Sequence, residues 1–274
     1  MTTQRIFITG GASGLGRAIA LRYARAGWRV CIGDVNATRG AEVLRELQPL
    51  AAAALYLPCD VTRAEDLRAV AERLTADWGG VDVVVNNAGV AAPGALEDVP
   101  LEDWERVLDI NVMGVVRGCH VFTPLFKRQG HGHFVNVSSL AGLLDVPRAS
   151  CYNASKAAVV SLSETLQNEF AGTGLEVTLV CPSFFKTNLA ESLRNVDSAT
   201  RAAVNRVLER SKVSAEDIAE QIFQAVRERT FYVLPHAQGR QAWLMKRLLP
   251  RPLYMRVINK QMRRMRGSDS LKDG

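Results

Sequence analysis

The stretch from Arg5 to Gly16, RIFITGGASGLG, joins a short apolar run to a loop rich in glycine. The apolar run predicts a buried strand, and the pattern GRAIALRYARAG that begins at Gly16 predicts a helix. Unpaired N–H groups at the start of such a helix attract an anion, and glycines at 10, 14 and 16 would let a phosphate approach the backbone. Their spacing, G-x-x-x-G-x-G, matches neither G-x-G-x-x-G nor a Walker loop, so the loop alone predicts either a tight turn or a phosphate site.

The alternation of apolar runs and helical patterns continues along the chain. Uniformly apolar strands are typical of a parallel sheet that helices cover on both faces, so we expect a doubly wound α/β fold. One long helical pattern covers residues 101–126. We expect one domain over residues 1–238 and a helical extension over 239–274. Further strands are expected at Arg29–Gly33, Ala54–Pro58, Val81–Asn86, His133–Val137, Glu176–Cys181 and Thr230–Leu234.

The composition is that of an ordinary globular protein, with 47% hydrophobic and 23% charged residues among 274. No apolar run is long enough to span a bilayer and no secretory leader is recognisable, so we expect a cytoplasmic protein. The cysteines lack zinc-binding spacing, which predicts no metal site and small buried thiols. The net charge is +6, but residues 236–274 carry +8 and the rest −2, which argues against nucleic-acid binding by the main body.

Asp34 ends the second predicted strand, at about the spacing from the glycine loop that a ribose-binding carboxylate has. Such a carboxylate would accept hydrogen bonds from the ribose hydroxyls of a dinucleotide and would repel a 2′-phosphate. No Lys or Arg stands at Ser13 or Val35 to compensate, and we expect Arg39 to be solvated. These residues favour NAD over NADP.

Five motifs occur together between Arg5 and Leu234: TGGASGLG, CDV at Cys59–Val61, NNAG at Asn86–Gly89, NVSS at Asn136–Ser139 and YNASK at Tyr152–Lys156. In this order the chain resembles the short-chain dehydrogenase/reductase family. The resemblance implies a Rossmann-type fold with seven parallel strands, nicotinamide-dependent oxidation or reduction of an alcohol/carbonyl pair, and a homodimer or homotetramer.

The loop and the resemblance together give the expected cofactor contacts. Thr187 would meet the nicotinamide carboxamide, and Ser183 replaces the glycine that the family usually has after Pro182. The expected contacts are Thr9, Gly10, Ser13, Gly14, Leu15, Gly16, Asp34, Asp60, Val61, Asn87, Ala88, Gly89, Tyr152, Lys156, Pro182 and Thr187.

Tyr152 and Lys156 are four residues apart at the start of a predicted helix, which places them on one face. A tyrosine that accepts a proton near neutral pH must lose about three units from its usual pKa of about 10. An ammonium about 4 Å away would supply about that free energy, so we expect Lys156 to lower the pKa of Tyr152. Ser139 follows a strand thirteen residues earlier and would hold the substrate oxygen. By resemblance, Asn111 would hold a water and the lysine in a proton relay.

The substrate is less well defined by the sequence. Apolar residues in 143–149 and in a lid at about 183–211 favour a hydrophobic secondary alcohol or ketone, or are simply packed lid residues; they are Leu143, Leu144, Phe184, Phe185 and Leu189. Two other functions stay open: an NADPH-dependent carbonyl reductase with the same site, and a dinucleotide-sensing protein without catalysis.

The extension from residue 239 onward carries a basic amphipathic pattern, with an apolar stripe at Tyr254, Ile258, Met262 and Met265. The pattern predicts packing on the pocket or on a neighbouring subunit, or peripheral contact with a membrane surface.

Overall fold

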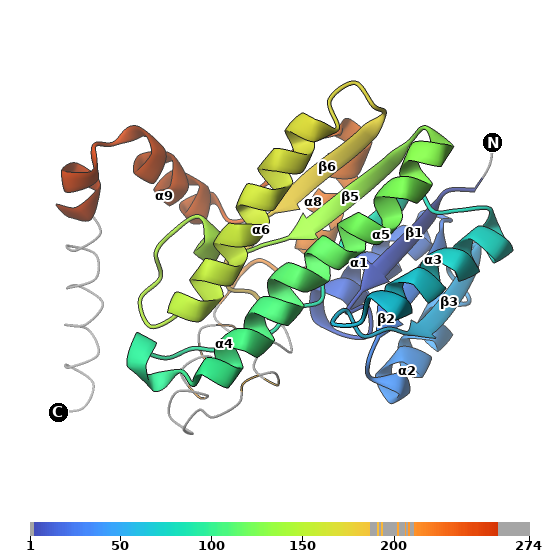
Figure 1. Ribbon diagram of the computed structural model, residues 1–274, viewed down its shortest axis with the longest axis horizontal. Coiled ribbons are helices and arrows are strands. Elements are labelled where there is room, and N and C mark those ends of the chain that lie inside the picture. The colour runs from blue at the N-terminus through green and yellow to red at the C-terminus, as the bar shows by residue number, and fades with distance from the viewer. Residues whose placement is uncertain are drawn as a thin grey trace. The chain divides into compact units, whose positions relative to one another are not determined.

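The computed structural model describes residues 3–186, 191, 193, 202, 206, 208 and 211–256. Within these residues the chain forms one parallel sheet of seven strands, which confirms the predicted doubly wound α/β fold (Figure 1). The strand order is β3-β2-β1-β4-β5-β6-β7. The strands are β1 (Arg5–Thr9), β2 (Arg29–Asp34), β3 (Ala53–Pro58), β4 (Val83–Asn86), β5 (Gly132–Val137), β6 (Leu175–Val180) and β7 (Tyr232–Val233).

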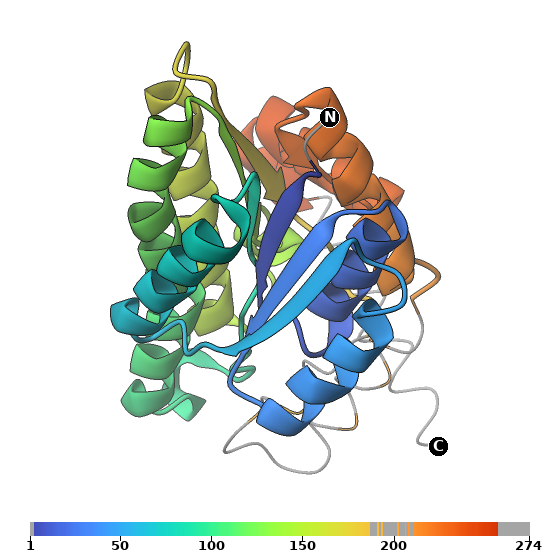
Figure 2. The same cartoon turned by 90° about the vertical axis from the view of Figure 1, so that its right-hand side faces the viewer.

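Helices cover both faces of this sheet, as the turned view in Figure 2 shows. On one face α1, α2 and α8 bury a continuous apolar core against β1 and β2. The opposite face carries α3, α4, α5 and α6. The bounds are α1 (Gly14–Arg25), α2 (Ala37–Leu47), α3 (Ala64–Trp78), α4 (Leu101–Leu108), α5 (Gly114–Gln129), α6 (Ser150–Glu169) and α8 (Ala215–Glu228).

The chain order reverses at β1, which pairs with β2 on one side and with β4 on the other. In an open parallel sheet the loops leave a crevice at this point, outside the carboxyl ends of the strands. Thr9 ends β1 and Asn86 ends β4, so the glycine loop and the NNAG motif meet there.

The predicted long helix at 101–126 is not uniform. α4 ends at Leu108, a π-helical turn spans Asp109–Met113, and α5 begins at Gly114. A π turn inserts one extra residue into an α-helix and occurs often at functional sites. Asn111 lies in this turn and is fully buried.

Residues 236–274 form a compact unit separate from residues 1–235. Its described part holds α9 (Ala237–Leu248) and a helical segment at 251–256. The predicted apolar stripe beyond Tyr254 lies outside the described residues. No helix in the described part of the chain is both long and apolar enough to cross a membrane.

Candidate active site

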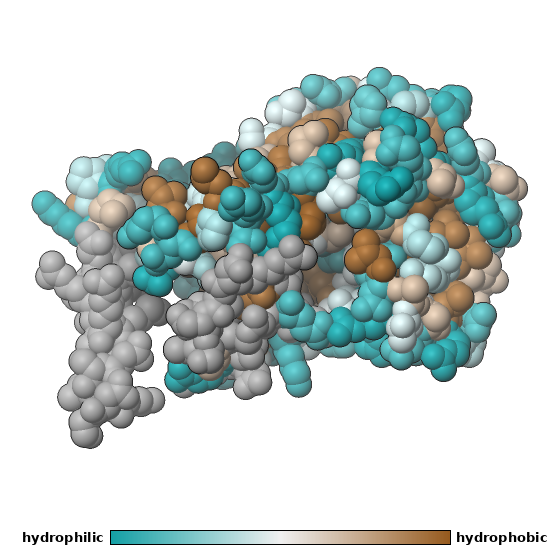
Figure 3. All heavy atoms as spheres, turned by 60° about the horizontal axis from the view of Figure 1, so that its bottom comes forward, coloured by the Kyte–Doolittle hydropathy of each residue, from teal (hydrophilic) through white to brown (hydrophobic). Residues whose placement is uncertain are grey.

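A cavity of about 670 Å³ opens at the carboxyl ends of the strands. In Figure 3 the surface is hollowed beside the grey atoms, and apolar residues lie along the hollow. The cavity is lined by the glycine loop, by the ends of β2 to β6 and by the start of α6. Across the residues that the structure describes, no cluster of His, Cys, Asp or Glu side chains is arranged to hold a metal ion.

The glycine loop lies open to the cavity at the start of α1. Gly10 and Gly14 have φ angles of +62° and +50°, which side chains rarely adopt. A Cβ on Gly16 would overlap the Gly10 carbonyl oxygen, so Gly16 permits close packing of the helix against the loop. Ser13 is the N-cap of α1, and its side chain makes no capping hydrogen bond. The backbone is therefore shaped to bring N–H groups against a phosphate, which fits a dinucleotide at this site.

Thr9 and Asn87 tie the ends of β1 and β4 together. The Thr9 hydroxyl accepts hydrogen bonds from the backbone N–H groups of Asn87 (3.0 Å) and Ala88 (3.1 Å). The Asn87 amide donates to the carbonyl oxygens of Thr9 (2.9 Å) and Gly10 (3.1 Å). Thr9 is 2% exposed and does not line the cavity, and neither does Gly16. Both positions were expected to contact the cofactor, whereas here they shape the wall behind the cavity.

Asp34 is fixed by backbone hydrogen bonds at the end of β2. One carboxylate oxygen accepts from the N–H of Ala12 at 3.0 Å, and the other accepts from the N–H of Asn36 at 2.9 Å. The carboxylate is therefore held against the glycine loop and lines the cavity. Its remaining lone pairs can accept hydrogen bonds from two hydroxyl groups.

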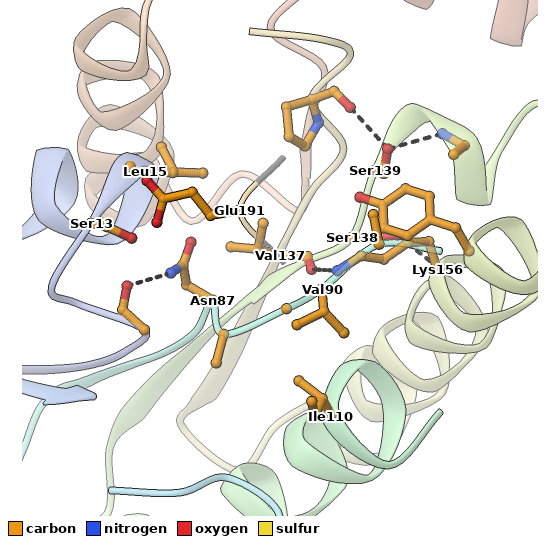
Figure 4. Close-up of a pocket in the computed structure, with 18 of the residues that line it drawn as sticks. Ser13, Leu15, Asn87, Val90, Ile110, Val137, Ser138, Ser139, Lys156 and Glu191 are labelled. Carbon is orange, nitrogen blue, oxygen red and sulfur yellow. Dashed lines mark hydrogen bonds between the residues drawn. The ribbon is translucent and has the colours of Figure 1, made fainter. Parts of the chain in front are cut away.

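Next to Asp34, the cavity wall carries an ion pair that the sequence did not suggest. Arg39, which was expected to be solvated, pairs with Glu191 at 2.7 Å. Figure 4 shows Glu191 beside Ser13 and Leu15, so residue 191 reaches the same end of the cavity as the glycine loop.

Two further predicted residues follow β3. The Asp60 carboxylate accepts hydrogen bonds from the Thr62 backbone N–H (2.9 Å) and hydroxyl (2.8 Å), and Asp60 and Val61 both line the cavity. Ala88 and Gly89, after β4, line it as well.

Ser139, Tyr152 and Lys156 lie together deeper in the cavity. The Ser139 hydroxyl donates to the Pro182 carbonyl at 3.3 Å, accepts from the Ala141 N–H at 3.1 Å and is hydrogen-bonded to Tyr152. Lys156 is 4% exposed, and its ammonium donates to the Val137 carbonyl oxygen at 3.0 Å (Figure 4). The Lys156 Nζ lies 5.8 Å from the centre of the Tyr152 ring.

The protein groups do not lower the pKa of Tyr152, contrary to the expectation from sequence. Burial raises the pKa of Tyr152 to about 12, although the hydrogen bond from Ser139 opposes the rise. Burial also lowers the pKa of Lys156 to about 8, so its positive charge is itself disfavoured. Desolvation of the phenol therefore outweighs the lysine, and Tyr152 is a neutral phenol near pH 7.

Asn111 is held by backbone and side-chain partners instead of lying on a helix surface. Its amide oxygen accepts from the Val90 N–H at 2.8 Å, and its amide nitrogen donates to the Val90 carbonyl (2.9 Å) and to Ser155 (3.0 Å). These bonds join the loop after β4 to α6. Any Cβ on Gly89 would lie 3.2 Å from the Asn111 oxygen and 3.4 Å from the Lys156 nitrogen, so Asn111 and Lys156 flank the same glycine.

After β6, Pro182 lines the cavity, and its carbonyl oxygen also accepts from the Leu140 N–H at 2.8 Å. Ser183, Phe184 and Phe185 line the cavity too. The predicted contact Thr187 lies outside the described residues, as does the lid residue Leu189.

The sequence reasoning missed part of the wall. Ile110, Arg148 and Glu191 line the cavity from three separate loops or turns. No motif marks them, because only the fold brings these segments together. The five cysteines are free and buried, as predicted; Cys59 lines the cavity.

Comparison with known proteins agrees with this geometry. The family model for short chain dehydrogenase matches residues 4–198. The probable oxidoreductase EphD of Mycobacterium tuberculosis H37Rv is 38% identical over 185 residues, which cover 67% of this chain and 31% of EphD. The chain thus spans about a third of the length of that relative.

Two relatives match over nearly their whole length. The 3-oxoacyl-[acyl-carrier-protein] reductase FabG of Thermotoga maritima is 31% identical over 85% of this chain and 94% of FabG. The crystal structure of a short-chain dehydrogenase/reductase from Burkholderia phymatum, in complex with NAD, has a TM-score of 0.83 and 34% identity over 90% of this chain and 95% of that one. The chain therefore belongs to the short-chain dehydrogenase/reductase family of oxidoreductases.

Proposed function

We propose that this protein transfers a hydride between NAD(H) and a secondary alcohol/ketone pair, with Tyr152 as the general acid and base. One observation carries the proposal. Tyr152, hydrogen-bonded to Ser139, lies beside Lys156 in the cavity that also holds the glycine loop and Asp34. When bound, the nicotinamide accepts or supplies the hydride, and its oxidised ring carries a positive charge.

The side chains divide the remaining work. Ser139 orients the substrate oxygen, and Tyr152 gives a proton to that oxygen in the reducing direction or takes one from it in the oxidising direction. Lys156 holds the nicotinamide ribose and, with the charge of the oxidised ring, favours the phenolate that oxidation needs. Asn111 positions Lys156 through the relay at Gly89.

Carbonyl reduction is the direction that the protein groups favour near neutral pH. With a pKa raised to about 12, Tyr152 carries the proton that a developing alkoxide needs. The similarity to FabG, whose name describes a reductase, supports the same direction.

The choice of NAD over NADP rests on Asp34. Its carboxylate is held in place by Ala12 and Asn36, and it would repel a 2′-phosphate. Arg39, the nearest cation of the wall, is paired with Glu191. The NAD complex of the Burkholderia protein supports this choice, and an NADPH-dependent reductase is the alternative.

Substrate and cofactor are tested by a screen of secondary alcohols and ketones with NAD(H) and NADP(H). We expect turnover of apolar ketones with NADH. Equal or better turnover with NADPH would refute the cofactor assignment. Tight NADH binding without turnover of any substrate would instead favour a dinucleotide-sensing protein.

For the C-terminal unit we propose peripheral contact with an anionic membrane. Leu244 and Leu248 lie one turn apart on α9 and are 43% and 76% exposed, with Arg240 and Arg247 exposed nearby. Residues 229–268 contain no Asp or Glu. Co-sedimentation with vesicles containing phosphatidylglycerol, but not with pure phosphatidylcholine, would support this contact. A cytoplasmic location and a homodimer or homotetramer complete the proposal, and light scattering measures the latter.

A further inference from the structure

The charged residues of the cavity wall fall into two groups and one remainder. Six of the described lining residues carry a charge. Asp34, Asp60 and the Arg39–Glu191 pair lie at the end proposed for the adenosine, and Lys156 lies beside Tyr152. The remaining charge is Arg148, in the loop that precedes α6.

The surroundings of Arg148 are apolar. Val146, Pro147 and Ala149 line the cavity next to it, and Phe184 and Ile110 line it from other segments. A guanidinium at the edge of an apolar cavity attracts an anion there, because few polar groups of the protein compete for it.

Arg148 also holds an unusual backbone conformation. Its φ angle is +57°, and the other described non-glycine residue with positive φ is Arg229. Arg229 is the C-cap of α8, where a left-handed residue is ordinary, whereas Arg148 ends no helix. A left-handed conformation costs a non-glycine residue about 1 kcal/mol or more, so it persists only where the surroundings impose it.

A contact between two loops imposes this conformation. The Arg148 carbonyl oxygen accepts from the Gly94 N–H at 2.9 Å, and Gly94 forms a β-bridge with Ala149. Gly94 packs so closely that an added Cβ would lie 2.7 Å from Val99. The loop after β4 therefore fixes Arg148 at the cavity edge, four residues before Tyr152.

The guanidinium is available to a ligand. Its ion pair with Asp98 is long, at 3.7 Å, and the side chains are 68% and 58% exposed. Exposed pairs of this kind contribute little stability, so a substrate anion can replace Asp98.

From these observations we propose that Arg148 binds an anionic end group of the substrate, so that the preferred substrate is a keto acid with an apolar chain between its ketone and its carboxylate. This inference rests on the proposed function, with the ketone at Tyr152 and Ser139. A bidentate Arg–carboxylate contact at the edge would place the ketone end deeper in the cavity.

The test compares two ketones of equal chain length with NADH, 5-oxohexanoate and the neutral 2-hexanone. We expect the wild type to reduce the acid with a kcat/KM at least about tenfold higher. Arg148→Gln should lower that value about tenfold to a hundredfold for the acid and by less than about twofold for 2-hexanone. Arg148→Lys should keep part of the preference, and Asp98→Asn should increase it.

Two variants separate binding from folding. Arg148→Gly suits the positive φ, so it should fold at least as stably as the wild type and still lose the acid preference. Arg45→Gln changes an exposed arginine that does not line the cavity, and should leave the ratio of the two substrates unchanged.

An equal loss for both ketones in Arg148→Gln, or a wild type with no acid preference, would overturn the assignment while leaving the proposed function intact. If no ketone is reduced at all, the proposed function fails, and calorimetry with hexanoate in the presence of NADH still decides the role of Arg148. Hexanoate binding at least about tenfold weaker in Arg148→Gln supports it, and equal binding refutes it.

Discussion

The two ends of the cavity are constructed in different ways. At the cofactor end, Gly10, Asp34, Asp60 and Asn87 sit directly after strands β1 to β4, and backbone hydrogen bonds hold them in place. At the substrate end, the wall comes from loops before α6 and after β6, and it is mostly apolar. The comparison teaches that strand ends fix the part that all substrates share, whereas loops vary the part that distinguishes them.

The largest expected effect lies where the two ends meet. Tyr152→Phe removes the proton donor while keeping the ring, so we expect kcat to fall at least about a hundredfold with NADH affinity nearly unchanged. Steady-state kinetics and NADH fluorescence titration measure the two quantities. Tyr232→Phe, which removes a phenol bonded to Glu164 on the surface, is the matched control. Full activity of Tyr152→Phe would remove the basis for a common catalytic point.

A smaller effect is expected at the cofactor end. Asp34→Asn removes the charge that repels a 2′-phosphate but keeps the size, so the ratio of kcat/KM for NADPH over NADH should rise about tenfold. Glu42→Gln on α2, exposed and outside the cavity wall, should leave this ratio as it is. An unchanged ratio in Asp34→Asn would mean that the strand end does not select the nucleotide.

At the substrate end, we expect a change of a few fold to about tenfold. Phe184 is 49% exposed and lines the cavity. Phe184→Ala should lower kcat/KM for a long apolar ketone such as 2-decanone, because part of the apolar contact is lost, without changing the KM for NADH. Leu96→Ala, exposed and distant from the wall, serves as its control. A raised KM for NADH would show that the two ends are not separable.

The smallest effect on activity is expected at the opposite edge of the sheet. His133 lies near the start of β5, and burial lowers its pKa to about 4. Its Nε2 lies 2.8 Å from the Thr178 hydroxyl, which donates its proton to the Thr230 carbonyl, so Nε2 is the donor in a neutral imidazole. Protonation in the folded state would charge this buried ring.

The sign of the pH effect follows from that depressed pKa. Between the ordinary pKa of about 6.5 and the folded value of about 4, the unfolded chain binds more protons, so stability falls as pH falls. We expect His133 to account for a loss of about 2 kcal/mol in the free energy of unfolding from pH 7 to pH 5. Urea unfolding at both values should show a smaller loss in His133→Gln and no change in His120→Gln. Equal pH dependence in all three proteins would contradict the assignment.

Much of the fold could be predicted because strand ends carry their own signals. The glycine loop, the NNAG motif and the Tyr152–Lys156 pair each stand beside a recognisable apolar run. Arg148 and Glu191 carry no local signal, since their neighbours in space come from elsewhere in the chain. The charge state of Tyr152 was also out of reach, because it depends on burial that spacing does not reveal. The interruption at Asp109–Met113 was missed because its stabilising partners, Val90 and Ser155, are distant in sequence.

That interruption has a consequence for how the chain tolerates change. One residue advances an α-helix by about 100° around its axis, so the additional residue at Asp109–Met113 resets the angular phase of everything downstream. Deleting a single residue here would restore a regular α-helix locally and rotate α5 by about that angle. Gly118, which makes room for the Asn86 side chain, would then turn away from it and bring a bulkier neighbour into its place. The segment 109–113 should therefore accept substitutions far more readily than insertions or deletions.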